Sequence, residues 1–244
     1  MPLSNLNYNS SDLPPGLRDK FIRLWKFIAI PIVIGFLVSS VKFFLTANQF
    51  KKEILNQASK SIQTQTNTSL APADFEKLFG AGQPAFGVPT AKVKIALFGD
   101  FSCPACYLFF PTIRKIMNNY ADKIYLVFHD FPGFDFSQSA AEAGRCANAQ
   151  KKFWPLHDLM FQSQNKLETI NIKKYALQAG LNTATFNQCL DSGRFKTAVD
   201  NDVILGASLG VTGTPTLFIN GYKLEGDISE NILRQAIEII LTSQ

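Results

Sequence analysis

The chain has 244 residues, 46% of them hydrophobic, and a formal net charge of +5. The charge is uneven: residues 1–70 carry eight Lys and Arg against three Asp and Glu, which leaves 16 of each sign for residues 71–244. A nucleic-acid-binding domain needs a basic face on its folded part. The neutral composition of residues 71–244 therefore argues against a nucleic-acid partner.

An apolar run near the N-terminus predicts a membrane helix. From Phe27 to Leu45 the sequence reads FIAIPIVIGFLVSSVKFFL, and Lys42 is its only charged residue. A helix that spans a bilayer needs about 20 apolar residues, within a range of about 17–25. A buried helix of a soluble domain is one alternative, but it would show polar residues on one face. A cleaved signal peptide is another, with residues 38–40 as its small-residue cleavage site.

We favour an uncleaved signal anchor over residues 27–47. Six basic residues flank it: Arg18, Lys20, Arg23 and Lys26 before it, and Lys51 and Lys52 after it. This modest bias favours a cytoplasmic tail at residues 1–26 and a catalytic domain outside the cytoplasm, in the periplasm or at the cell surface. Residues 48–71 are rich in Gln, Asn, Ser and Thr, which predicts a flexible spacer.

Residues 72–244 are expected to form one folded domain. In chain order, the patterns predict a helix at 73–79, a loop at 81–90, a strand at 93–98, a helix at 103–120, a strand at 123–129, an insert of three or four helices at about 135–207, strands at 216–219 and 222–225, and a terminal helix at 228–241. Two strands joined through a helix predict a parallel pair, and Asn220-Gly221 predicts a hairpin. The expected fold class is therefore α/β.

The four cysteines include one close pair, Cys103 and Cys106, spaced C-x-x-C. A zinc site would need a second close pair or suitably spaced histidines, and neither His129 nor His157 has that spacing. Cys103 ends a strand–loop segment and opens a helix, with Pro104 at the first helical position. Unpaired N–H groups and the helix dipole stabilise a thiolate there. Redox exchange is favoured over the alternatives of a structural disulfide or two adjacent thiols.

The segment Phe98 to Cys106 resembles the active-site strand and loop of the DsbA-like branch of the thioredoxin superfamily. Residues 151–161 (KKFWPLHDLMF) and 209–221 (LGVTGTPTLFING) resemble two further segments of that branch, and Pro111 resembles its helix-kinking proline. The resemblance covers residues 72–241. It implies a thioredoxin fold with a helical insertion, preceded here by the expected transmembrane helix.

The resemblance also implies the roles of the site residues. Cys103 would be the nucleophile, Cys106 the resolving cysteine, and Pro215 a cis-proline facing the pair. The substrate-binding residues would be Thr214, Pro104 and Ala105. An ordinary trans proline is the alternative at residue 215. The chemistry would use no cofactor and no metal.

Two positions depart from the family pattern. Relatives often carry an acidic residue six positions before the first cysteine, where this chain has Leu97, so the route of the proton is open. Ala105 replaces the histidine of the strongest oxidants. We therefore expect the pKa of Cys103 to be lowered, but less than in those relatives. Asp100 is close by, and we interpret it as a cap or an acceptor of loop N–H groups.

Cys146 and Cys189 occupy positions where some relatives have a second, non-catalytic disulfide. Such a bridge is favoured in an oxidising compartment, and two buried thiols are the alternative. His129 and His157 are interpreted as packing or capping residues.

The predicted function is to introduce disulfides into exported proteins by exchange through Cys103 and Cys106. A disulfide isomerase or reductase remains open, as does a redox-inactive, chaperone-like binding domain. The expected partners are reduced or partly folded exported proteins and a DsbB-like membrane protein that reoxidises the pair.

Overall fold

The computed structural model describes residue 32 and residues 39–46, 48–49, 52–53, 69–226 and 228–243. The chain divides into two units, Met1–Gln57 and Ala58–Gln244, and the folded domain lies in the second. The expected anchor, residues 27–47, falls largely outside the described residues. Within the described ranges, no helix has both the length and the hydropathy that a membrane crossing requires.

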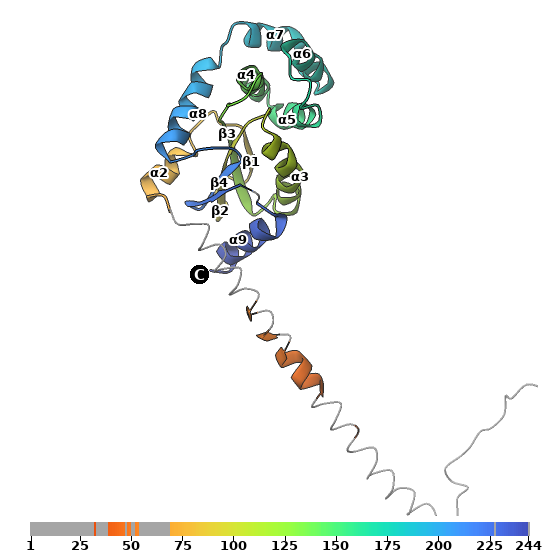
Figure 1. Ribbon diagram of the computed structural model, residues 1–244, viewed down its shortest axis with the longest axis vertical. Coiled ribbons are helices and arrows are strands. Elements are labelled where there is room, and N and C mark those ends of the chain that lie inside the picture. Colours follow the sequence, from red (N-terminus) through yellow and green to blue (C-terminus); the bar gives the residue numbers. More distant parts are fainter. Residues whose placement is uncertain are drawn as a thin grey trace, which may run out of the picture. The chain divides into compact units, whose positions relative to one another are not determined.

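A five-stranded sheet forms the centre of the domain, in the order β1-β3-β2-β4-β5 (Figure 1). Its strands are β1 (Ala85–Gly87), β2 (Val93–Gly99), β3 (Ile124–Asp130), β4 (Thr216–Ile219) and β5 (Tyr222–Glu225). As predicted, β2 and β3 pair in parallel, and β4 and β5 form an antiparallel hairpin. β4 also pairs antiparallel with β2, so the late hairpin extends the same sheet.

The loop predicted at residues 81–90 is wrong in part, because residues 85–87 form the edge strand β1, antiparallel to β3. A three-residue strand is too short to show a period-2 pattern, and the surrounding glycines and prolines indicate only a loop. Gly87 ends this strand at φ +89°, and a Cβ there would lie 2.1 Å from the carbonyl oxygen of Ile124. Only glycine therefore fits this close approach of the two strands.

Both faces of the sheet are buried, and side chains alternate between two cores. Along β2, Val93, Ile95 and Leu97 join one core, whereas Ala96 and Phe98 join the other. Figure 1 shows the helices that cover them. α3 (Pro104–Asn119) and α9 (Glu230–Thr242) pack with the first core, while α2 (Pro72–Lys77) and α8 (Lys196–Ser208) lie beside the second.

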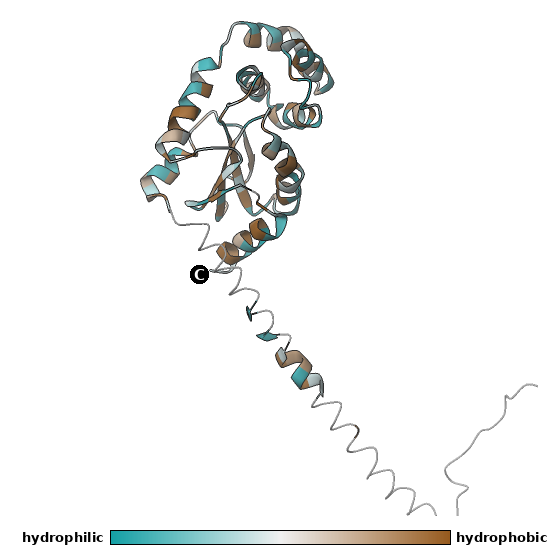
Figure 2. Cartoon of the chain, in the orientation of Figure 1, coloured by the Kyte–Doolittle hydropathy of each residue, from teal (hydrophilic) through white to brown (hydrophobic). Residues whose placement is uncertain are grey.

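The terminal helix α9 is amphipathic, as its sequence predicts. Leu233, Ala236 and Ile237 are buried, and Ile232 and Ile240 are partly buried against the same core. Figure 2 shows hydrophobic and hydrophilic residues on different parts of this helix. Ser229 caps its N-terminus by accepting a hydrogen bond from the backbone N–H of Ile232.

The insert between β3 and β4 contains five helices, rather than the three or four expected. They are α4 (Ser137–Asn148), α5 (Phe153–Gln162), α6 (Thr169–Gln178), α7 (Thr183–Asp191) and α8. The breaks are short: Gly180 and Gly193 adopt positive φ and end α6 and α7 within a few residues of the next helix. A disulfide joins Cys146 on α4 to Cys189 on α7.

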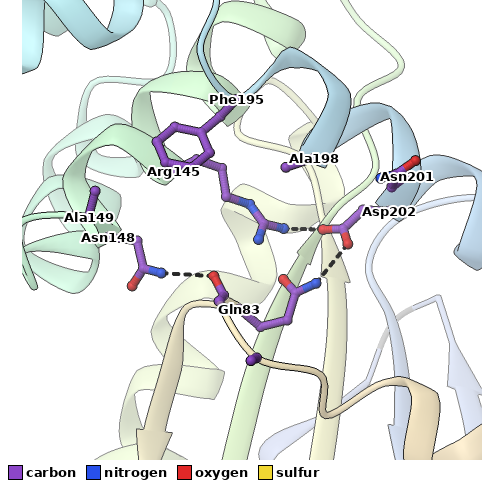
Figure 3. Close-up of a pocket in the computed structure, with 10 residues that line it drawn as sticks. Gln83, Arg145, Asn148, Ala149, Phe195, Ala198, Asn201 and Asp202 are labelled. Atoms are coloured by element: carbon purple, nitrogen blue, oxygen red, sulfur yellow. Dashed lines mark hydrogen bonds and ion pairs between the residues drawn. The ribbon is translucent and has the colours of Figure 1, made fainter.

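A buried charge network ties the insert to the sheet, and Figure 3 shows the part of it formed by Arg145, Asp202 and Gln83. Arg145 of α4 donates from Nε to Asp130 Oδ2 at 2.5 Å and from Nη2 to Asp202 of α8. Asp202 also contacts Nδ1 of His129, on β3, at 3.0 Å, and accepts a hydrogen bond from Gln83 at 2.9 Å. His129 is thus a buried packing residue, as interpreted from the sequence.

Replacing Arg145 is predicted to be costly. Arg145→Met would leave two buried carboxylates without their cation, and breaking a buried ion pair in this way costs about 3–5 kcal/mol. Urea unfolding of the full chain, followed by circular dichroism, measures the change. Lys173→Met is the matched control, because its ion pair with Asp191 is partly exposed and is worth at most about 1 kcal/mol. Equal losses in the two variants would contradict the role of the network.

Candidate active site

The first cysteine caps the helix that carries the second. β2 ends at Gly99, and Cys103 is the N-cap of α3, in an extended conformation with φ −74° and ψ 122°. Pro104 follows at the first helical position, where the missing N–H is harmless. The backbone N–H groups of Ala105 and Cys106, at the start of this helix, lower the pKa of the Cys103 thiol. The reactive sulfur therefore lies at a helix terminus, as the sequence predicts.

Asp100 holds the loop before the cysteine, as the sequence interpretation proposed. Its Oδ1 accepts hydrogen bonds from the Ser102 N–H at 2.8 Å and the Ser137 hydroxyl at 2.5 Å. Its Oδ2 accepts one from the Gly133 N–H at 2.8 Å. These contacts join the active-site loop to the start of the insert.

Gln164 is a second support of the loop, and sequence reasoning missed it. Its Nε2 donates to the carbonyl oxygens of Phe101 at 2.8 Å and Cys103 at 2.9 Å. The residue lies just after α5, in a polar stretch where glutamines and asparagines are common. No local pattern separates it from its neighbours, since its role follows from the position of α5 in space.

Thr214 and Pro215, just before β4, lie opposite the loop that carries Cys103. Thr216 pairs with Phe98, so the chain before β4 lies opposite the end of β2. The peptide bond between Thr214 and Pro215 is cis, as the resemblance implied. The Cys103 sulfur lies 3.3 Å from the Thr214 carbonyl oxygen and donates a hydrogen bond to it when the thiol is protonated.

The two thiols are equally buried but have opposite ionisation. Each is 4% exposed. The hydrogen bond from the Cys106 thiol is the largest cause that lowers the pKa of Cys103, from 9.0 to about 5, against the opposing effect of burial. The Thr214 side chain and the two helix N–H groups lower it further. The same hydrogen bond to Cys103, together with burial, raises the pKa of Cys106 far above its usual range.

This pattern assigns different chemistry to the two sulfurs. Cys103 is a thiolate at neutral pH, and Cys106 is a protonated thiol beside it. The sequence argument attributed the thiolate mainly to the helix terminus. In the structure the helix N–H groups contribute less than the Cys106 side chain does. The pair can therefore attack a disulfide through Cys103 and resolve the product through Cys106.

A small cavity lies behind the pair. It measures about 10 Å³, and its wall includes Cys106, Leu97, Pro215 and His157. His157 is 1% exposed and packs among aromatic rings, including Phe101 and Phe161. Its burial agrees with the packing role predicted from the sequence. The structure also brings it to the wall that the resolving cysteine lines, which the sequence did not indicate.

Exposed side chains surround the buried sulfurs. Pro104 and Ala105 are exposed, and Tyr107 and Leu108 on the next turn of α3 are 46% and 76% exposed. Phe101 and Phe109 are core residues, Phe110 and Phe131 are half-buried, and Phe134 and Phe136 are exposed.

Comparisons with known proteins agree with this fold. The catalytic domain of ScsC from Proteus mirabilis is 25% identical, with a TM-score of 0.61 over 70% of this chain and 96% of that one. The thiol-disulfide exchange protein alpha-DsbA2 from Wolbachia pipientis is 22% identical, with a TM-score of 0.63 over 77% and 98%. The domain thus has the thioredoxin-like fold of DsbA-like oxidoreductases.

A curated relative matches by sequence: a Na(+)/H(+) antiporter, NhaA 3, from Salinispora tropica is 31% identical over 154 residues, 62% of this chain. The match covers 24% of that protein, so the chain spans about a quarter of the length of the curated relatives it matches.

The profile of the thioredoxin family matches residues 81–239, which include Cys103, Cys106 and the cis-proline. The chain therefore belongs to the thioredoxin family.

Proposed function

We propose that this chain is a protein thiol–disulfide oxidoreductase that introduces disulfides into exported proteins. The observation that carries the proposal is the pairing of a low-pKa Cys103 with a protonated Cys106 at the N-terminus of α3. A thiolate of low pKa is a good leaving group, which favours transfer of the disulfide to a client.

The exchange has two steps. A client thiolate attacks Cys103 of the oxidised pair, so that a client–Cys103 disulfide forms, the Cys103–Cys106 bond breaks, and Cys106 takes up a proton. A second client thiolate then attacks the client sulfur of this mixed disulfide and expels Cys103 as a thiolate. The client loses two electrons, and the cysteine pair gains them.

The client would bind as an extended strand beside Thr214, whose backbone lies against the reactive sulfur. Pro104 and Ala105, with the exposed Tyr107 and Leu108, would contact its apolar side chains. Reduced or partly folded proteins expose such segments. This surface supports a general protein substrate rather than a small thiol.

Two other roles use the same residues. An isomerase or reductase would use the same thiolate, and the reduction potential separates these roles from an oxidase. A redox-inactive, chaperone-like domain would keep the pair as a permanent disulfide. The strong separation of the two pKa values favours an active pair over that alternative.

We also propose that residues 27–47 anchor the chain in a membrane, with residues 1–26 cytoplasmic, residues 48–71 as a spacer, and the catalytic domain in the periplasm or at the cell surface. The apolar run supports this, as do Val41, Phe43, Phe44 and Leu45, which are 57–76% exposed. A DsbB-like membrane protein would reoxidise the pair and complete the cycle.

The first prediction concerns the thiolate. Titrating the ultraviolet thiolate absorbance of the reduced chain should give a midpoint near pH 5 for Cys103. Cys106→Ala removes the hydrogen bond that lowers the pKa of Cys103 most. The titration midpoint of Cys103 in this variant should therefore move toward 9.0. The folded pKa is below the unfolded one, so the reduced form gains stability as pH rises from about 5 to 9 and loses it as pH falls. An unchanged midpoint in Cys106→Ala would contradict this account.

The second prediction concerns activity. Cys103→Ser should abolish the oxidative refolding of a reduced multi-disulfide protein, whereas the surface variant Lys173→Met should refold it at the parental rate. The reduction potential of the pair, measured against glutathione, should lie nearer about −120 mV than the thioredoxin value of about −270 mV. A potential at or below the thioredoxin value would favour the reductase.

The third prediction concerns the anchor. The full chain should fractionate with membranes and resist extraction at alkaline pH, because about 20 apolar residues hold it in the bilayer. A chain that lacks residues 1–47 should appear in the soluble fraction with its exchange activity intact. Recovery of the full chain as a soluble protein would refute the anchor without affecting the redox assignment.

A further inference from the structure

The resolving cysteine needs a proton acceptor that the family pattern does not supply. Cys106 is buried and protonated, yet it must become a thiolate to attack Cys103 in a mixed disulfide. At the position where relatives often carry an acid, this chain has Leu97, whose side chain lines the cavity behind the pair. The carboxylate of Asp100 already accepts three hydrogen bonds, from Ser102, Gly133 and Ser137.

We propose that His157 is the proton-relay residue of Cys106 and acts across the cavity whose wall the two side chains share. The inference rests on the proposed function. Of the residues that line this cavity in the described part of the chain, Cys106 and His157 are the ionisable ones, and a histidine can gain or lose a proton near neutral pH. A volume of about 10 Å³ is about the room that one water molecule needs, so a water could carry the proton between them.

The hydrogen bonds of the ring set its orientation. Nδ1 lies 3.0 Å from Asp158 Oδ1, and a carboxylate can only accept, so Nδ1 carries the proton. Asp158 is itself held by Arg114, with Nη2 3.2 Å from Oδ2. The bond to Asp158 is the only hydrogen bond of the ring within residues 69–226. Nε2 therefore keeps its lone pair and can act as a base.

The surroundings keep His157 neutral until it accepts that proton. Aromatic rings from α3, α5, β3 and the active-site loop enclose it: Phe110, Phe153, Trp154, Phe161, Phe128 and Phe101. Burial lowers the pKa of His157, and Arg114 lowers it further, whereas Asp158 raises it. Among the described residues, Asp158 and Arg114 are the charged groups that act on the ring, and Cys106 lines the same cavity.

The step balances without another reactant. When Cys103 is bonded to a client, Nε2 takes the proton of the Cys106 thiol. The Cys106 sulfur then attacks Cys103, the Cys103–Cys106 bond forms, and the client sulfur leaves as a thiolate. The imidazolium then gives its proton to solvent. In the oxidase direction the step runs in reverse: His157 takes up a proton from solvent and gives it to Cys106 as the pair opens. Asp158 stabilises the imidazolium in both directions.

A two-phase reaction of the reduced full chain with Ellman's reagent separates the two thiols. The first thionitrobenzoate is released when Cys103 forms the mixed disulfide, and the second when Cys106 resolves it. In His157→Gln, the first release should be unchanged, and the second should be slowed at least about tenfold near neutral pH, with loss of its pH inflection, because a general base contributes about 10²–10⁴-fold.

Phe153→Leu is the matched control, because it loosens the packing of the ring while the base and the cavity wall remain. It should leave the pH inflection of the second release in place. Unchanged second-phase kinetics in His157→Gln would overturn the proposal, and so would the same loss of the inflection in Phe153→Leu. A parent chain without a first release would instead refute the proposed function.

Asp158→Asn gives an independent test if His157→Gln does not fold, because Asp158 is partly exposed, with 25% of its side chain accessible. Its carboxylate raises the pKa of His157, so its removal should move the inflection of the second release to lower pH and weaken the base. The first release should again be unaffected. An inflection that stays at the parental pH would contradict the relay.

Discussion

The site depends on one hydrogen bond, which the Cys106 thiol donates to the Cys103 sulfur. It makes the two residues different, since it favours the anion on one sulfur and disfavours it on the other. The two sulfurs come from the N-cap and the first turn of α3. Contacts from elsewhere in the fold surround Cys103: Asp100 and Gln164 bind the loop, and the Thr214 carbonyl oxygen lies 3.3 Å from the Cys103 sulfur.

Two buried polar sites serve different needs. One lies in the core that contains Cys103, Cys106 and the aromatic residues around His157, where low polarity raises the importance of each remaining polar group. The other is the network of Arg145, Asp130 and Asp202 at the end of β3, which fixes the insert to that strand.

Much of this architecture could be predicted from residues alone. Strands and helices with clear periodicity, such as β2, α3 and α9, agree with the predicted ranges to within two residues. The residues with a chemical signature, Cys103, Cys106 and Pro215, are brought together as the pattern indicated. β1 was missed because three residues carry no period, and the insert has more helices than predicted because its breaks are short.

The sequence carries no signal for residues whose role depends on their position in the tertiary structure. Gln164 resembles any surface glutamine until α5 is placed against the active-site loop. His157 was interpreted as a packing or capping residue, and that interpretation does not show which cavity its ring borders. The sequence also explained the low pKa of Cys103 only in part. Pro104 indicates a helix terminus there, whereas no sequence pattern gives the direction of the hydrogen bond between the two cysteines.

The contact of Gln164 with the carbonyls of Phe101 and Cys103 couples two parts of the molecule that the topology separates. The side chain comes from the insert, and the carbonyls belong to the thioredoxin core. A client that binds against the insert would therefore displace the backbone of Cys103. Client binding and the reactivity of Cys103 would then be coupled, because a client bound in the wrong position would leave the Cys103 sulfur misaligned.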